Sequence, residues 1–155
     1  MEERFTIPGD PVGKQRPKAA FQQRRIYTPS KTINYESFVK YCYYGHKHFG
    51  ERPVEMAFDI YLPIPKSVSR KRAIEMEQGK VRPAKKPDFD NVIKSICDGL
   101  NGVAYDDDKQ IVEVSRISKR YGRVPRVDVT IKDWIYLLLY PSTTRLSRLA
   151  NSLPG

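Results

Sequence analysis

Cysteine and histidine are scarce in this chain of 155 residues, which contains two of each. Cys42 and Cys97 are too few and too far apart for a disulfide framework or a zinc motif, so we expect a reducing, cytoplasmic setting. Neither His46 nor His48 has a carboxylate or second ligand at a diagnostic spacing. We therefore take neither histidine as a general base or a metal ligand.

Long apolar runs are also missing. The apolar stretch at 134–140 is far shorter than the roughly 20 residues that a membrane-spanning helix needs, and the first residues are charged rather than apolar. We expect neither a membrane segment nor a secretory signal.

Acidic residues are outnumbered, since 18 Asp and Glu face 28 Lys and Arg for a formal net charge of +10. This balance favours a nucleic acid or another anionic surface as partner. The acid that is present is concentrated in one segment, which contains Asp88, Asp90, Asp98, Asp106, Asp107 and Asp108. A carboxylate cluster in a basic chain indicates a divalent metal ion that acts on phosphates.

The first half of this acidic segment is predicted to be a helix over 88–100. Ile93, Ile96, Cys97 and Leu100 recur at the spacing of one buried helical stripe, and 101–102 is an Asn-Gly pair suited to end it. On the opposite face, three side chains lie one turn apart, namely Asp90, Lys94 and Asp98. Taken singly, each acidic feature has an ordinary alternative. Asp88 or Asp90 could be a helix cap, and Lys94 could form a surface ion pair with its neighbours on the helix. The aspartates at 106–108 could form a solvated turn.

Taken together, they resemble the signature of the RusA family of Holliday junction resolvases. The matching residues are Asp88-Phe89-Asp90-Asn91, Lys94, Asp98, Leu100-Asn101-Gly102 and Asp107-Asp108-Lys109-Gln110-Ile111. Near the N-terminus, Ile7-Pro8-Gly9, Pro11, Lys14 and Arg16-Pro17-Lys18 look like the basic opening loop of many phage-encoded members. The similarity covers about residues 4 to 132. The resemblance to phage-encoded members suggests a role in phage or prophage DNA processing.

The resemblance implies a homodimeric, Mg²⁺-dependent endodeoxyribonuclease that resolves four-way DNA junctions by paired symmetric nicks. Carried over residue by residue, Asp88, Asp90 and Asp108 would ligate the metal, and Lys94 would be the catalytic lysine. Mn²⁺ is expected to substitute for Mg²⁺. Asp107 lies beside the third ligand position and is open to the same role.

Basic residues that precede the acidic segment in the chain are candidates for phosphate contacts, although a solvated charged surface is the ordinary alternative. We assign DNA binding to Lys14, Arg16, Lys18, Arg70, Lys71, Lys85 and Lys86.

The fold expected is a single α/β (α+β) domain over 1–132, with helices packed on a small, mixed, mostly antiparallel sheet. Residues 133–155 form a C-terminal extension to which no role is assigned. Alternating apolar residues predict strands over 5–7, 54–62, 111–119 and 127–131, the last two as a hairpin. Helices are expected over 31–49, capped by Ser30, and over 67–78, while 8–23 is expected to be a loop.

Other function classes stay open at this point. A nuclease of the same kind could act on flaps, forks or other branched DNA. A noncatalytic DNA-binding protein could keep the fold, although binding alone needs no carboxylates facing phosphate. An interaction module could instead engage an acidic protein through the leucine-rich C-terminal segment.

Overall fold

The structure is a computed structural model that describes residues 1–20 and 25–134. Nearly all of the expected C-terminal extension therefore lies outside the described residues, and its role stays a prediction. Within the described part, no helix is long and apolar enough to cross a membrane.

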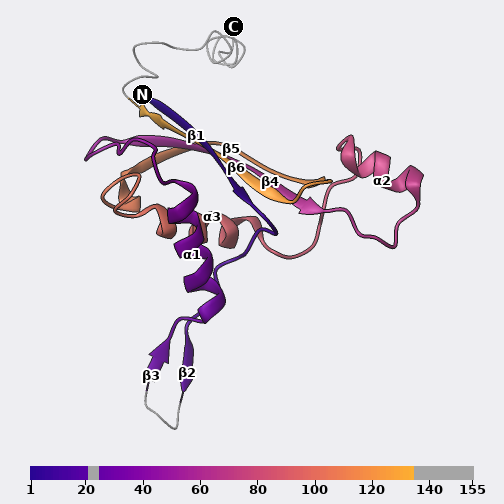
Figure 1. Ribbon diagram of the computed structural model, residues 1–155, viewed down its shortest axis with the longest axis horizontal. Helices are drawn as coiled ribbons and strands as arrows, with labels where there is room; N and C mark the ends of the chain where they lie inside the picture. The colour runs from indigo at the N-terminus through magenta and orange to yellow at the C-terminus, as the bar shows by residue number, and fades with distance from the viewer. Residues whose placement is uncertain (21–24, 135–155) are drawn as a thin grey trace, which may run out of the picture.

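A four-stranded mixed sheet forms the centre of the molecule (Figure 1). Its strands are β1 (Glu2–Pro8), β6 (Arg126–Asp133), β4 (Val54–Pro63) and β5 (Ile111–Gly122), in that spatial order. The β1–β6 and β6–β4 pairs are antiparallel, whereas β4 and β5 run parallel. The expected class, a single α+β domain with a mixed and mostly antiparallel sheet, is confirmed.

The expected hairpin of the last two strands is wrong. β4 lies between β5 and β6 and pairs with both of them. Residues 123–125 connect strands two spacings apart, roughly 9.5 Å. Three extended residues can span that gap, so a short connection does not require neighbouring strands. β5 therefore lies at the edge of the sheet, where Val112, Val114 and Ile117 are exposed, whereas the inward-facing side chains of β4 are all buried.

Helices α1 (Ser30–Cys42) and α3 (Phe89–Leu100) cover the same side of the sheet. The residues of β4 predicted to point inward are confirmed as core, namely Val54, Met56, Phe58, Ile60 and Leu62. The two helices pack tightly at Gly99, where an added Cβ would lie 2.9 Å from the backbone oxygen of Glu36 and 2.9 Å from Cβ of Val39. This contact holds α3 against α1 and sets the position of the acidic face of α3.

The boundaries of α1 and α2 differ from the sequence prediction. α1 ends at Cys42 instead of 49, because the chain turns through Gly45 at a φ of +87°. Ser30 is the first helical residue and Pro29 takes the N-cap position. α2 (Arg70–Glu77) is capped by Ser69, whose hydroxyl accepts a hydrogen bond from the Arg72 N–H at 3.2 Å.

The stretch expected to be a loop contains a short strand. β2 (Lys18–Ala20) pairs antiparallel with β3 (Arg25–Tyr27) and forms a separate two-stranded ribbon. Figure 1 shows this ribbon projecting from the beginning of α1, away from the four-stranded sheet. Neither strand was predicted from the sequence, because three-residue strands leave too short an alternation to detect.

Candidate active site

The predicted site begins at the N-terminus of α3. Asp88 is the N-cap residue with extended backbone angles, but its side chain makes no capping hydrogen bond. Asp90 lies in the first turn, and both side chains are exposed. The capping interpretation therefore holds for the backbone position of Asp88 and does not account for its carboxylate.

A hollow of about 430 Å³ lies directly beside Asp88. Three predicted site residues meet there, Lys14 and Lys86 as well as Asp88, together with Lys31 and Asn91. The N-terminal loop is fastened to α3 at this point, because the N–H of Lys14 donates to the Asn91 carbonyl at 2.9 Å. The hollow thus combines one carboxylate with three lysines, a composition suited to an anionic ligand.

Lys14 reaches past the hollow to the acidic face of α3. Its ammonium forms an ion pair with Asp98 and a second one with Glu36 of α1, the latter at 3.4 Å. Burial acts to lower the pKa of Lys14, but the hydrogen bond and charge of Asp98, with the charge of Glu36, outweigh it and raise the pKa. Sequence reasoning treated Lys14 as a surface phosphate contact and did not find this pairing.

The second group of acidic residues follows α3 in the turn before β5. Asp107 caps the short 3-10 helix η2 (Asp108–Gln110), and its Oδ1 accepts from the Lys109 N–H at 2.9 Å. That hydrogen bond lowers the pKa of Asp107. Desolvation raises the pKa of Asp108, and the negative charges of Asp98 and Asp107 raise it further.

The two neighbouring aspartates therefore have different surroundings. The carboxylate of Asp107 is engaged in a local cap, whereas that of Asp108 is held near Asp98 and within the influence of Lys14. This difference favours Asp108 over Asp107 as the residue that interacts with a cation. Asp98 also belongs to the candidate site, because it lies near Asp108 and forms an ion pair with Lys14. In the sequence, Asp98 is recognisable by its spacing of eight residues from Asp90, which places both on one face of the helix.

The complete set of proposed ligands is not gathered. Among residues 1–20 and 25–134, no three Asp, Glu, His or Cys side chains are arranged to hold a metal ion. Asp108 interacts with Asp98, which lies about 12 Å along the helix from Asp90. Lys94 is exposed between them and has no ion pair within the described chain. The roles of Asp88, Asp90, Lys94 and Asp108 stay predictions.

The predicted DNA-binding residues fall into separate groups. Lys14 and Lys86 line the hollow, while Arg16 and Lys18 lead into the ribbon. Arg70 and Lys71 lie on α2, which Figure 1 shows at the end of the sheet away from the ribbon. Lys85 has its ammonium 5.6 Å from the ring centre of Tyr121. The DNA-binding roles of these residues stay predictions.

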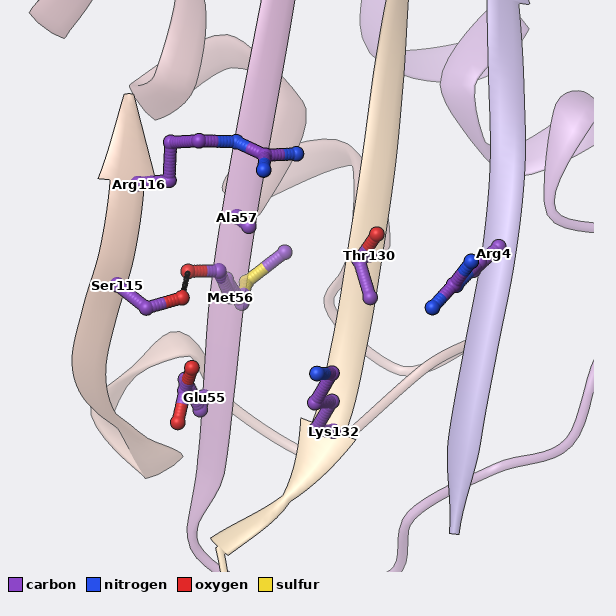
Figure 2. Close-up of a pocket in the computed structure, with 8 residues that line it drawn as sticks. All are labelled: Arg4, Glu55, Met56, Ala57, Ser115, Arg116, Thr130 and Lys132. Carbon is purple, nitrogen blue, oxygen red and sulfur yellow. Dashed lines mark hydrogen bonds between the residues drawn. The ribbon is translucent and has the colours of Figure 1, made fainter. Parts of the chain in front are cut away.

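Another hollow, of about 270 Å³, lies across the strands of the main sheet (Figure 2). Its charged lining comes from four strands and comprises Arg4, Glu55, Arg116 and Lys132. Figure 2 shows these side chains along one sheet face, where Ser115 donates a hydrogen bond to the Met56 carbonyl at 3.4 Å. None of the predicted site residues lines it, so we do not place the chemistry there.

The scarce histidines and cysteines have structural surroundings. Nδ1 of His46 lies 2.7 Å from Oε2 of Glu3, a pairing that was not evident in the sequence because the two residues are 43 positions apart. Its ring also stacks on Tyr43, with 5.1 Å between ring centres. Cys97 is buried in the core, as its place on the predicted helical stripe indicates, and burial raises the pKa of its thiol to about 12.

Comparison with known proteins gives a family. The family model described as "Endodeoxyribonuclease RusA" matches residues 8–132, which include α3, η2 and the lysine-lined hollow. A relative from Bacillus subtilis (strain 168), named "Uncharacterized protein YqaN", is 35% identical over 136 residues, covering 84% of this chain and 95% of the relative. The chain therefore belongs to the RusA family of endodeoxyribonucleases.

Proposed function

We propose that the protein is a Mg²⁺-dependent, structure-selective endonuclease that resolves four-way DNA junctions by paired nicks in opposite strands. The observation that carries the proposal is a family match that spans the acidic face of α3 and the lysine-lined hollow beside it. Carboxylates supply cation ligands, and the lysines supply the positive charge that draws a phosphate to them.

The residue roles are those that the resemblance to the RusA family implies. Asp88, Asp90 and Asp108 are the proposed metal ligands. Lys94 extends from the same helix face as Asp90 and is proposed to offset the negative charge that grows on the phosphate during cleavage. Lys14, Lys31 and Lys86 would hold the DNA backbone at the mouth of the hollow, as ionic contacts to phosphate oxygens do.

The donors present suit a hard divalent cation, and two observations support that fit. The carboxylate of Asp88 makes no capping hydrogen bond, and neighbouring negative charges help to raise the pKa of Asp108. A cation relieves such repulsion. When bound, Mg²⁺ supplies electrostatic stabilisation of the phosphate charge and activates water at neutral pH. The three carboxylates have to move closer together for one ion to contact all of them.

A homodimer is part of the proposal. Symmetric nicks in two opposite strands need two active sites, and a twofold pair of identical subunits provides them in the simplest way. Each subunit would contribute one acidic site and one set of basic contacts.

Cleavage of a synthetic four-way junction tests this function. The junction, a fork and a linear duplex of matched sequence are incubated with Mg²⁺ or with EDTA, and nicks are mapped on each labelled strand. Paired nicks in opposite arms, with Mg²⁺ and only on the junction, are expected. Equal cutting of the fork would widen the substrate to branched DNA in general, and binding without cutting in any divalent ion would contradict an enzymatic role.

A further inference from the structure

The β2–β3 ribbon has features that the cleavage site does not use. Its residues belong to a stretch, 11–35, that contains six basic side chains and no acidic one. The six are Lys14, Arg16, Lys18, Arg24, Arg25 and Lys31. A positive segment of this density repels itself and attracts the backbone of a nucleic acid.

The pairing of the ribbon sorts its side chains onto two faces. Lys18 lies directly opposite Tyr27, and Arg25 precedes Tyr27 by two positions, so these three side chains share one face. All three are exposed, and Tyr27 shows 45% of its surface. Ile26 points to the other face and is 79% exposed. One face is therefore aromatic and basic, and the other carries an aliphatic side chain.

An isolated two-stranded ribbon is marginal in water, because it has no second layer to cover its apolar groups. Here the ribbon forms a sheet of its own and does not pair with the four-stranded sheet. Figure 1 shows it extending beyond the rest of the described chain. Exposed apolar groups on such an arm indicate a partner that covers them on binding.

The base of the ribbon lies next to the proposed cleavage site. Lys18 follows Gln15 by three residues and Tyr27 precedes Lys31 by four, and both Gln15 and Lys31 line the hollow. Four residues span at most about 14 Å, which corresponds to roughly four nucleotide steps along one strand. A DNA strand with a phosphate in the hollow would thus bring bases within reach of Tyr27.

We propose that the β2–β3 ribbon recognises unstacked bases at a DNA branch point, with Tyr27 stacking on a base while Lys18 and Arg25 contact the flanking phosphates. An aromatic ring between cationic side chains is the arrangement by which proteins bind single-stranded nucleic acid. In a continuous duplex the base faces are covered by their neighbours, so only a branch offers the ring a surface. This inference rests on the proposed function and adds the means of recognising the branch.

The test compares Tyr27→Ala with Tyr44→Ala. Tyr44 is 89% exposed and lies outside the ribbon, so its replacement controls for loss of a surface tyrosine. Binding to a four-way junction and to a linear duplex of matched sequence is measured in EDTA, where cleavage cannot interfere. Tyr27→Ala should weaken junction binding by roughly 5-fold to 150-fold, because one base stack is lost. Duplex binding should change less than about twofold, as should both affinities of the control.

Two further arms separate stacking from other causes. Tyr27→Phe keeps the ring and should retain junction affinity, whereas a merely hydroxyl-dependent contact would be lost. With 2-aminopurine at positions within about four nucleotides of the nick, wild-type protein should change the fluorescence and Tyr27→Ala should not. Unchanged junction binding by Tyr27→Ala would overturn the inference. Equal weakening on junction and duplex would also overturn it and would place the ribbon in the major groove instead.

Failure of the ribbon inference can be distinguished from failure of the proposed nuclease function. Wild-type cleavage of the junction with Mg²⁺ is measured on the same preparation. If the wild type cleaves the junction and Tyr27→Ala binds it unchanged, only the ribbon inference fails. If the wild type binds junction and duplex equally and cleaves neither, both proposals fail.

Discussion

Replacing Lys14 by methionine tests the contact that joins the N-terminal loop to the acidic face of α3. The substitution keeps the length of the side chain and removes its charge. Asp98 and Glu36 would then lose their shared cation. Asp108 would lose the positive charge that acts to lower its pKa. We expect a less stable protein with greater repulsion among its carboxylates.

The magnitude follows from the burial of the pair. The side chains of Lys14 and Asp98 are 27% and 21% exposed, so water screens them less than it screens a surface pair. Exposed ion pairs contribute about 0.2–1 kcal/mol and hydrogen bonds to charged groups about 1.5–3 kcal/mol. We therefore expect Lys14→Met to lower the free energy of unfolding by about 1–2 kcal/mol. Each kcal/mol corresponds to a fall in Tm of about 2–4 °C in a protein of this size.

Urea unfolding at low salt measures this difference, with Lys31→Met as the control. Lys31 lines the same hollow, is exposed and has no ion pair in the part of the chain described, so its variant should stay within about 0.5 kcal/mol of wild type. Because the pKa of Lys14 is raised above 10.5, the stabilisation is present below that pH and is lost as the pH rises through the folded value. Equal stability of Lys14→Met, Lys31→Met and wild type at pH 7 would refute the ion pair.

Three further variants test the site and its support. Asp90→Asn should abolish cleavage while leaving junction affinity within about threefold of wild type, since Asp90 lies on the surface. Loss of both junction binding and helix content would instead assign Asp90 a structural role. Asp108→Asn should be more stable than wild type at pH 7, because the ionised form of Asp108 is disfavoured in the folded state. This gain in stability should vanish below pH 3.8, where Asp108 is protonated in both states. A difference in stability that stays constant across pH would refute the electrostatic cause. Gly99→Val should destabilise by about 1–3 kcal/mol in thermal melts, because its Cβ would meet α1 at 2.9 Å, and a variant as stable as wild type would contradict that packing.

Regular periodicity explains which parts of the fold could be predicted. β4 alternates over nine residues, and α3 carries a full helical stripe, so both were located within a residue or two. α2 was found because Gly79, at a φ of +76°, ends a short polar helix. In each case the local signal and the tertiary packing favour the same element.

The failures come from information that is not local. Nothing within 111–131 indicates that β4 inserts between the last two strands, since both pair with a strand that lies far earlier in the chain, at 54–63. The end of α1 was missed because Tyr43 and Phe49 continue the apolar character after the helix stops and join the core from the following turn. The β2–β3 ribbon was missed because its strands are only three residues long.

The candidate site was likewise predictable in its local features and not in its long-range contacts. The acidic segment and its basic surroundings were evident in the sequence, and the structure brings Lys14, Lys86 and Asp88 to one hollow. The pairing of Lys14 with Asp98 was not foreseeable, because 84 positions separate the two residues. The distinction between Asp107 and Asp108 also needed coordinates, since it depends on which carboxylate accepts the backbone hydrogen bond of η2.

Nicking of a labelled four-way junction by wild type, Asp107→Asn and Asp108→Asn tests whether the acidic site cleaves branched DNA and whether Asp108 takes part. We expect that wild type nicks the junction with Mg²⁺ and that Asp108→Asn is slower by at least roughly 100-fold, a loss of the size seen when one key electrostatic group is removed. Asp107→Asn should keep activity within about tenfold of wild type, because Asn can still cap η2. Wild-type protein that leaves the junction intact in both Mg²⁺ and Mn²⁺, or an Asp108→Asn variant that nicks it at the wild-type rate, would contradict the account.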